Sequence, residues 1–162
     1  MRGAKLRWPV FVGIFGVACA FGSFARADAP AGHFTSANGT VYDTKTKLTW
    51  QQLATTTLYQ WGPANTAGTA QNYCAAVLNL NGTGWRLPTI GELSSLLDHS
   101  KTGSGQVKID TTFFPNAAGT VFWTATGSAA GGNNAWVIDF STGVGSLEYF
   151  AGGGTAAVRC VR

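Results

Sequence analysis

Charged residues are scarce in this chain of 162 residues. They make up 11% of the sequence, against about 25% in an average soluble domain. The first 27 positions hold four of the eleven basic side chains and none of the seven acidic ones, so the +4 formal charge arises there. The remaining 135 residues carry seven charges of each sign. Binding to nucleic acid needs clustered Lys and Arg, so the composition argues against a nucleic-acid partner.

The chain also lacks an apolar run of the roughly 20 residues that a membrane-spanning helix needs. Residues 10–24 are apolar or small, and they follow a basic start with Arg2, Lys5 and Arg7. Ala25-Arg26-Ala27 then offers an A-x-A cleavage site. This pattern predicts a cleavable signal peptide of residues 1–27 and a secreted or periplasmic protein.

Other interpretations of this leader stay open. Residues 27–29 form a second A-x-A site, although cleavage there would leave Pro30 directly after the cut. The segment could remain as an uncleaved anchor. It could also carry a lipid on Cys19, although Gly16 stands where a lipobox normally has Leu.

Cysteine is equally scarce, with three residues in the chain. Loss of Cys19 with the leader leaves Cys74 and Cys160, and two cysteines in an oxidising compartment most simply form one disulfide. The two cysteines are 86 positions apart. Closing a loop of that length stabilises the folded state by about 4–5 kcal/mol at best. A metal site or catalytic thiol would need partners that the sequence lacks, because there is no CxxC and His33 and His99 lie far apart. We therefore expect no metal and no cofactor.

Two helices are predicted. The first covers about residues 70–80, where Tyr73, Val77 and Leu80 share one face and Asn81-Gly82 ends the helix. The second begins at Thr89, an N-cap residue that forms a capping box with Glu92 at N3. An apolar stripe follows, made of Leu93, Leu96 and Leu97, and Asp98-His99 ends it. Glu92 can also be interpreted as a catalytic acid.

Strands are expected on both sides of these helices. Residues 40–50 read as a hairpin, and residues 51–68 show no clear period. From Gly103 onward the pattern alternates with period two, which predicts a four-strand antiparallel meander. Its strands are residues 121–126, 135–140, 146–150 and 156–161. The predicted class is α+β, with two helices packed on a small twisted antiparallel sheet system.

The segment Gly84–Leu93, GWRLPTIGEL, resembles the GWRLP-T-x-x-EL signature of the DUF1566 family, which is also called the Lcl C-terminal domain after a bacterial collagen-like adhesin. Further marks of the family occur in order: Val41-Tyr-Asp43, Leu48-Thr-Trp50, Ile109-Asp110, Phe114-Pro115, Phe122-Trp-Thr124, Trp136-Val-Ile-Asp-Phe140 and Val158-Arg-Cys-Val-Arg162. Residues 39–162 are thus expected to form one such domain, with residues 28–38 as a short lead-in.

The resemblance implies a C-type-lectin-like fold, distantly related to sulfatase-modifying enzymes and phage receptor-binding tips. In such folds a cysteine of the first helix bridges to the last strand, as Cys74 and Cys160 would. The resemblance supplies no activity, although the adhesin relative is associated with glycosaminoglycan binding. The tripeptides that hold a sugar-bridging calcium in lectin-like folds are missing from this sequence, which argues against such an ion.

The candidate site residues fall into two groups. Trp85, Arg86, Pro88, Thr89 and Glu92 are interpreted as a structural motif at the start of the second helix. The Gly-rich loop of residues 127–134 is the binding candidate, because rigid strands flank it. There Asn133 and Asn134 offer amide groups and Trp136 offers a stacking face, although an ordinary hairpin loop has the same composition.

These observations predict an exported binding module for a glycan or a cell-surface protein. A structural or envelope-associated protein-interaction domain is the alternative. An exported enzyme related to sulfatase-modifying factors comes third, because no G-x-S-x-G element and no uncommitted cysteine supports catalysis.

Overall fold

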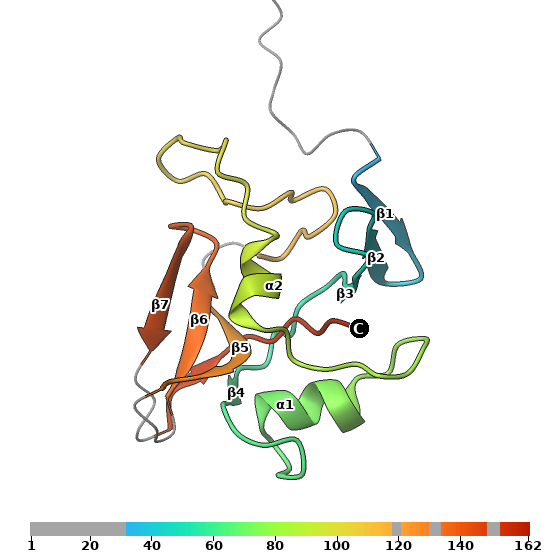
Figure 1. The fold of residues 1–162 in the computed structure, drawn as a ribbon, viewed down its shortest axis with the longest axis vertical. Coiled ribbons are helices and arrows are strands. Elements are labelled where there is room, and N and C mark those ends of the chain that lie inside the picture. Colours follow the sequence, from blue (N-terminus) through green and yellow to red (C-terminus); the bar gives the residue numbers. More distant parts are fainter. Residues whose placement is uncertain (1–31, 118–120, 130–133, 149–152) are drawn as a thin grey trace, which may run out of the picture.

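The computed structural model (Figure 1) describes residues 32–117, 121–129, 134–148 and 153–162. The expected signal peptide and the candidate residue Asn133 lie outside the described residues. The described part is an α+β fold with short helices, small antiparallel sheets and one disulfide. At this level the predicted fold class is confirmed.

The first sheet combines β1 (Phe34–Ala37), β2 (Thr40–Asp43) and β3 (Thr49–Gln51) in that order. Strands β2 and β3 confirm the predicted hairpin. Strand β1 was not predicted, and it falls within the expected lead-in. It joins β2 through a tight turn in which Asn38 and Gly39 have φ values of 50° and 77°, a conformation that favours these two residue types.

A second sheet is a meander of β5 (Val121–Gly127), β6 (Ala135–Asp139) and β7 (Val144–Glu148). Helix α2 (Ile90–Ser94) packs on β5 and β6, as Figure 1 shows. Apolar side chains on both faces of this sheet are buried, with Ile138 on one face and Val137 on the other. The meander is therefore a central layer of the fold.

The predicted fourth strand of the meander is wrong. Only Thr155–Ala156 is a strand, β8, and it pairs with the two-residue strand β4 (Tyr59–Gln60). Ala157 next pairs in parallel with Phe122 of β5, and further on Val161 bridges to Trp50 on one side and to Arg86 on the other. Within the described residues the C-terminal segment therefore pairs with β5 and does not pair with β7.

Both predicted helices are shorter than expected. The first consists of α1 (Ala70–Asn72) followed by a π-helical turn, η1 (Tyr73–Val77). The amide of Leu78 bonds to the carbonyl of Tyr73, and the backbone then becomes extended. After α2 the chain continues in a tighter, 3₁₀-type turn, in which the amide of Leu96 donates to the carbonyl of Leu93 three residues earlier.

Two apolar clusters form the core. One lies between α2, the first sheet and one face of the meander, and it contains Trp50, Leu93 and Phe122. The other lies on the opposite face, where Trp123 packs beside the bridge between Cys74 and Cys160. The predicted disulfide is confirmed, and it links η1 to the C-terminal segment across 86 positions.

Candidate functional site

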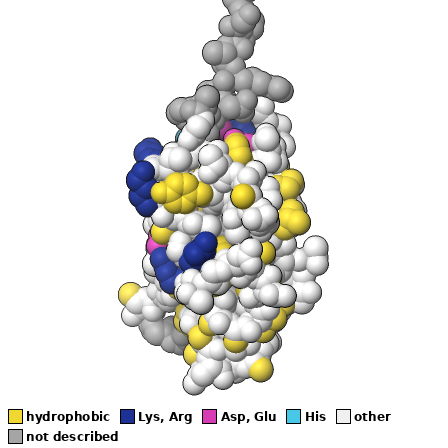
Figure 2. Space-filling model, turned by 90° about the vertical axis from the view of Figure 1, so that its right-hand side faces the viewer, with side chains coloured by type: hydrophobic (Ala, Val, Ile, Leu, Met, Phe, Trp, Pro, Cys, Tyr) yellow, Lys and Arg dark blue, Asp and Glu magenta, His cyan; other side chains and the backbone are white. Residues whose placement is uncertain are grey.

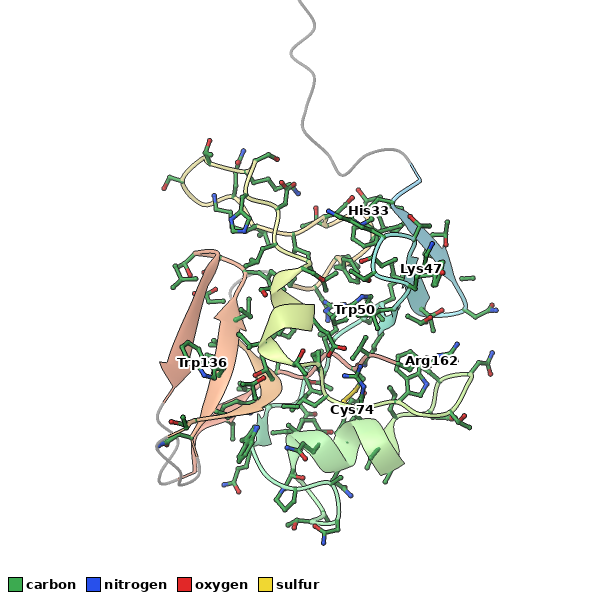
Figure 3. The ribbon with its side chains drawn as sticks, viewed as in Figure 1. His33, Lys47, Trp50, Cys74, Trp136 and Arg162 are labelled. Carbon is green, nitrogen blue, oxygen red and sulfur yellow. A yellow bond between two sulfur atoms is a disulfide. The ribbon has the colours of Figure 1, made fainter. Side chains whose placement is uncertain are left out.

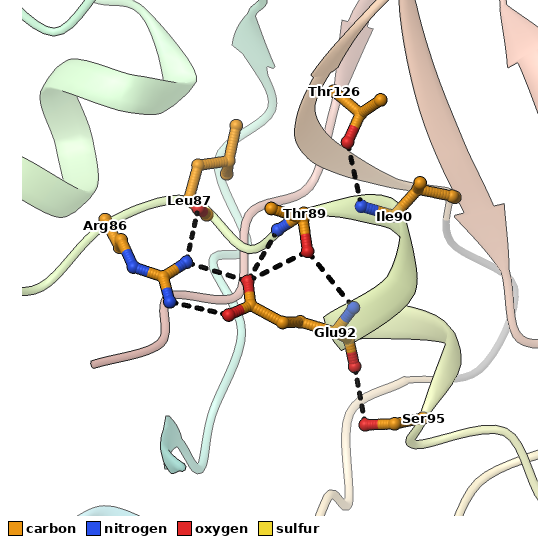
Figure 4. Close-up of polar contacts among 7 residues, drawn as sticks. All are labelled: Arg86, Leu87, Thr89, Ile90, Glu92, Ser95 and Thr126. Carbon is orange, nitrogen blue, oxygen red and sulfur yellow. Dashed lines mark hydrogen bonds and ion pairs between the residues drawn. The ribbon is translucent and has the colours of Figure 1, made fainter. Parts of the chain in front are cut away.

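The GWRLPT segment, residues 84–89, directly precedes α2 in the chain and is extended (Figure 4). The amide of Arg86 donates to the carbonyl of Val161 at 2.9 Å, and the amide of Ala125 donates to the carbonyl of Pro88 at 2.7 Å. Side chains alternate along it: Trp85 and Leu87 are buried, whereas the side chain of Arg86 is 46% exposed. The segment therefore presents Arg86 to solvent from a rigid backbone.

The predicted capping box is confirmed. The Thr89 hydroxyl accepts from the amide of Glu92 at 3.2 Å, and the amide of Thr89 donates to Oε2 of Glu92 at 2.8 Å. The amide of Ile90 donates to the hydroxyl of Thr126 on β5, which ties the helix start to the sheet. Glu92 thus has the structural role that the sequence predicts.

Glu92 also forms an ion pair that was not predicted. Arg86 donates from Nη1 to Oε2 at 2.7 Å and from Nη2 to Oε1 at 2.6 Å, a two-pronged contact. The hydrogen bond from Arg86, together with those from Thr89, lowers the pKa of Glu92 from 4.5 to about 2 despite partial burial. The same hydrogen bond raises the pKa of Arg86. Both groups are charged throughout the physiological range, and the pair has no net charge.

A cleft of about 390 Å³ opens beside this pair. Its lining consists of Ala64, Gln71, Ala75, Arg86, Leu87, Thr89, Glu92 and Ala125. These residues come from α1 and the loop before it, from η1, from the GWRLPT segment with α2, and from β5. Four of these eight side chains are apolar, three of them alanines, and the other four are polar. Apolar surface with a few polar groups is usual for a small-molecule site.

Some polar groups of the cleft have spare bonding capacity. Among the described residues, Arg86 has no partner for its Nε–H or for the second N–H of Nη2. Oxygen Oε1 of Glu92 accepts only one hydrogen bond, whereas Oε2 accepts three. The Gln71 amide makes no hydrogen bond to any described residue. The cleft thus offers adjacent donors and acceptors without a net charge.

The predicted binding loop does not present its described amide side chain to solvent. Asn134 is only 8% exposed, and its Oδ1 is buried with no hydrogen-bond partner there. Trp136 is half-buried on β6, on the far side of the molecule from Lys47 and Arg162 (Figure 3). Neither residue lines the cleft, so the two groups of candidate residues define separate places on the fold.

A buried arginine is a second unpredicted feature. Arg159 has no exposed surface, and its guanidinium lies 4.9 Å from the ring centre of Phe114. It donates to three oxygens: the carbonyls of Gln51 and Gln52 and Oδ1 of Asn116. Burial lowers the pKa of Arg159 to about 9. Arg159 links the C-terminal segment to the last residue of β3 and to the residue that follows it, and it does not line the cleft.

Asp43 is a further deeply buried ionisable side chain, with 1% of its surface exposed. It accepts hydrogen bonds from Thr46 and from the amide of Lys45, and His33 Nε2 lies 2.9 Å from its Oδ1. Burial raises the pKa of Asp43, but these hydrogen bonds outweigh the effect and hold it below the usual value. Asp43 therefore organises the turn between β2 and β3.

The charged surface is sparse. Figure 2 shows one face on which Lys and Arg side chains lie in small groups between larger uncharged areas. Lys101 and Lys108 share a loop, where their ammonium groups donate to the carbonyls of Ile109 and Lys101, respectively. Within the described ranges no three His, Cys, Asp or Glu side chains gather into a possible metal site, and no helix has the length and apolarity to cross a membrane.

The comparisons with known proteins identify one family. Its model, the Lcl C-terminal domain, matches residues 39–162, which span most of the chain and include every residue that lines the cleft. No curated protein and no solved structure gives a match. The chain belongs to the Lcl C-terminal domain family.

Proposed function

We propose that this chain is an exported, non-catalytic binding module that takes an uncharged carbohydrate in the cleft beside Arg86 and Glu92. The observation that carries the proposal is the neutral pair of Arg86 and Glu92 on a rigid rim, with unused donors and an unused acceptor. Sugar hydroxyls both donate and accept hydrogen bonds, so they match such a rim. A net charge would instead favour an ionic ligand.

The chemistry of Glu92 supports binding rather than catalysis. A general acid must carry a proton near the working pH, whereas Glu92 has a pKa of about 2. Both cysteines of the described part are joined in a buried disulfide, so neither offers a nucleophilic thiol. These features weigh against the enzyme alternative.

A C-type-lectin-like fold and export of the protein are also part of the proposal. A C-type-lectin-like arrangement agrees with the bridge between a first-helix cysteine and the C-terminal segment. Export agrees with the same bridge, because stable disulfides form mainly in oxidising compartments.

A glycan array probed with the chain, purified with its disulfide intact, tests the proposal. The cleft variant is Ala75→Leu, which adds three carbons at a lining position. The matched control is Ala76→Leu, since Ala76 is exposed on the same turn and does not line the cleft. We expect the wild type and Ala76→Leu to retain uncharged glycans, and Ala75→Leu to lose at least 90% of the signal.

Other results would contradict the proposal in different ways. Loss of array binding in Trp136→Ala, with Ala75→Leu unaffected, would move the site to the predicted loop on β6. An array without any signal, combined with specific capture of a cell-surface protein, would favour the protein-interaction alternative.

A further inference from the structure

The unused polar groups and the small apolar wall of the cleft narrow the ligand class. We infer that the cleft recognises a secondary acetamido group, as carried by an uncharged N-acetylhexosamine. This inference rests on the proposed function and deepens it. Its basis is that the donor and acceptor capacities of the site lie next to each other and beside alanine methyl groups.

The rim complements both polar ends of an amide. An amide N–H needs an acceptor, which Oε1 of Glu92 supplies with its unused capacity. The amide carbonyl needs a donor. In the part of the chain that the structure describes, two N–H groups of Arg86 have no partner, and the side-chain amide of Gln71, which also lines the cleft, makes no hydrogen bond. Hydrogen bonds to charged groups are stronger than those between neutral groups. An acetamido group carries an N–H and a carbonyl on one planar unit, so it can bond to Glu92 and to Arg86 or Gln71 at the same time.

The wall of the cleft complements the methyl end of an acetamido group. Ala64, Ala75, Leu87 and Ala125 contribute only hydrocarbon side chains to the lining. Burial of a methyl group against such a surface is favourable, and a plain hexose has no methyl group to place there. No Trp, Tyr or Phe lines the cleft, so contact through the edge of the sugar is expected instead of stacking on its face.

An amine in place of the acetamido group would bind worse. The ammonium group of an amino sugar meets a pair without net charge, so it gains no overall attraction. It also offers no carbonyl to accept a hydrogen bond from Arg86 or Gln71, and no methyl group for the apolar wall. A peptide also contains secondary amides. However, Ala125 is the one lining residue that belongs to a described strand. A peptide would therefore find no strand edge along which to pair, so strand-like peptide binding has little support.

The test is an amide-detected NMR titration of the oxidised chain with the methyl glycosides of N-acetylglucosamine, glucosamine and glucose. We expect the N-acetylglucosamine glycoside to bind at least five times more tightly than either of the others, with shifts at Gln71, Ala75 and Glu92. Gln71→Ala should reduce that preference to about twofold or less. Ala75→Leu should remove binding of all three glycosides, while Ala76→Leu should leave the titration unchanged.

The outcomes separate this inference from the proposed function. Equal affinity for the three glycosides, with shifts still confined to the cleft, would overturn the acetamido inference and leave carbohydrate binding standing. Tighter binding of an N-acetylated peptide than of the N-acetylated sugar, at the same residues, would also overturn it. Absence of shifts with every sugar here and on the array would contradict both proposals.

Discussion

Replacement of Glu92 by Gln measures how strongly the pair with Arg86 stabilises the fold. Gln retains an oxygen for the amide of Thr89, so the capping box survives, but the charge that Arg86 faces is lost. Lowering the pKa of Glu92 from 4.5 to about 2 corresponds to about 3 kcal/mol at 1.36 kcal/mol per pKa unit. The side chain of Arg86 is 46% exposed, so solvent screens the pair. We therefore expect Glu92→Gln to lower the free energy of unfolding by about 1–2 kcal/mol at pH 7.

The pH dependence of this loss has a definite sign. The folded state holds Glu92 at a lower pKa than the unfolded chain, so the carboxylate stabilises the fold at pH values above about 4.5. That stabilisation should fall as the pH drops from about 5 to 2, where the folded state also takes up the proton. The wild type and Glu92→Gln should therefore converge in stability near pH 2.

Urea unfolding at pH 7, 5, 4, 3 and 2 provides the measurement, with Arg86→Met and the double variant completing a mutant cycle. Because each single change breaks the same pair, the two effects should be non-additive by about 1 kcal/mol at pH 7. Asp139→Asn serves as the carboxylate control, since hydrogen bonds from Ser141 hold Asp139 without Arg86. Additive effects of Glu92→Gln and Arg86→Met, or a constant difference between wild type and Glu92→Gln down to pH 2, would refute this reasoning.

Further outcomes are expected from other parts of the structure. Cys74→Ser and Cys160→Ser should each cost about 2–5 kcal/mol in urea unfolding, the double variant should cost little more, and thiol titration of the unreduced chain should find no reactive thiol from this pair. Arg159→Met should cost about 2–4 kcal/mol, because it leaves buried carbonyl oxygens without donors; a neutral or stabilising effect would show that desolvation of the charge dominates. Carbohydrate binding should change less than twofold between 50 and 300 mM salt, and heparin retention that disappears in a Lys45→Ala, Lys47→Ala variant would contradict that expectation.

Features that depend on neighbouring residues were predictable from the sequence. Thr89 and Glu92 lie three positions apart, and that spacing alone places their groups in reciprocal contact at a helix start. The hairpin of β2 and β3 follows in the same way from alternation on each side of a short turn. The pairing of Cys74 with Cys160 follows from two expectations, namely that Cys19 is lost with the leader and that the compartment is oxidising.

Features that depend on the path of the chain were not predictable in this way. Alternation in residues 156–161 indicates a strand, but it does not reveal which segments lie on each side. The chain makes one short parallel contact with β5 at Ala157 and then enters the core, instead of pairing with β7 as a fourth antiparallel strand. Arg159 contradicts the general preference of arginine for the surface, because main-chain carbonyls distant in sequence supply its partners. Likewise, the pair of Arg86 and Glu92 needs an extended segment to turn into a helix within six positions.

The candidate site illustrates how a structural motif can also prepare a binding surface. Oxygen Oε2 of Glu92 is saturated by Arg86 and by the backbone and hydroxyl of Thr89, so it serves the fold. Among the described residues, oxygen Oε1 has a single partner, Arg86, and can accept another hydrogen bond, and Glu92 belongs to the lining of the cleft. The contacts that fix the first oxygen also fix the position of the second, so the site is preorganised before any ligand arrives. In Glu92→Gln one of the two positions must carry an NH₂ group, and the cap requires oxygen at the inner one. The amide nitrogen would then take the position of Oε1 and replace an acceptor by donors, so this substitution should abolish preference for an amide N–H while leaving the helix start in place.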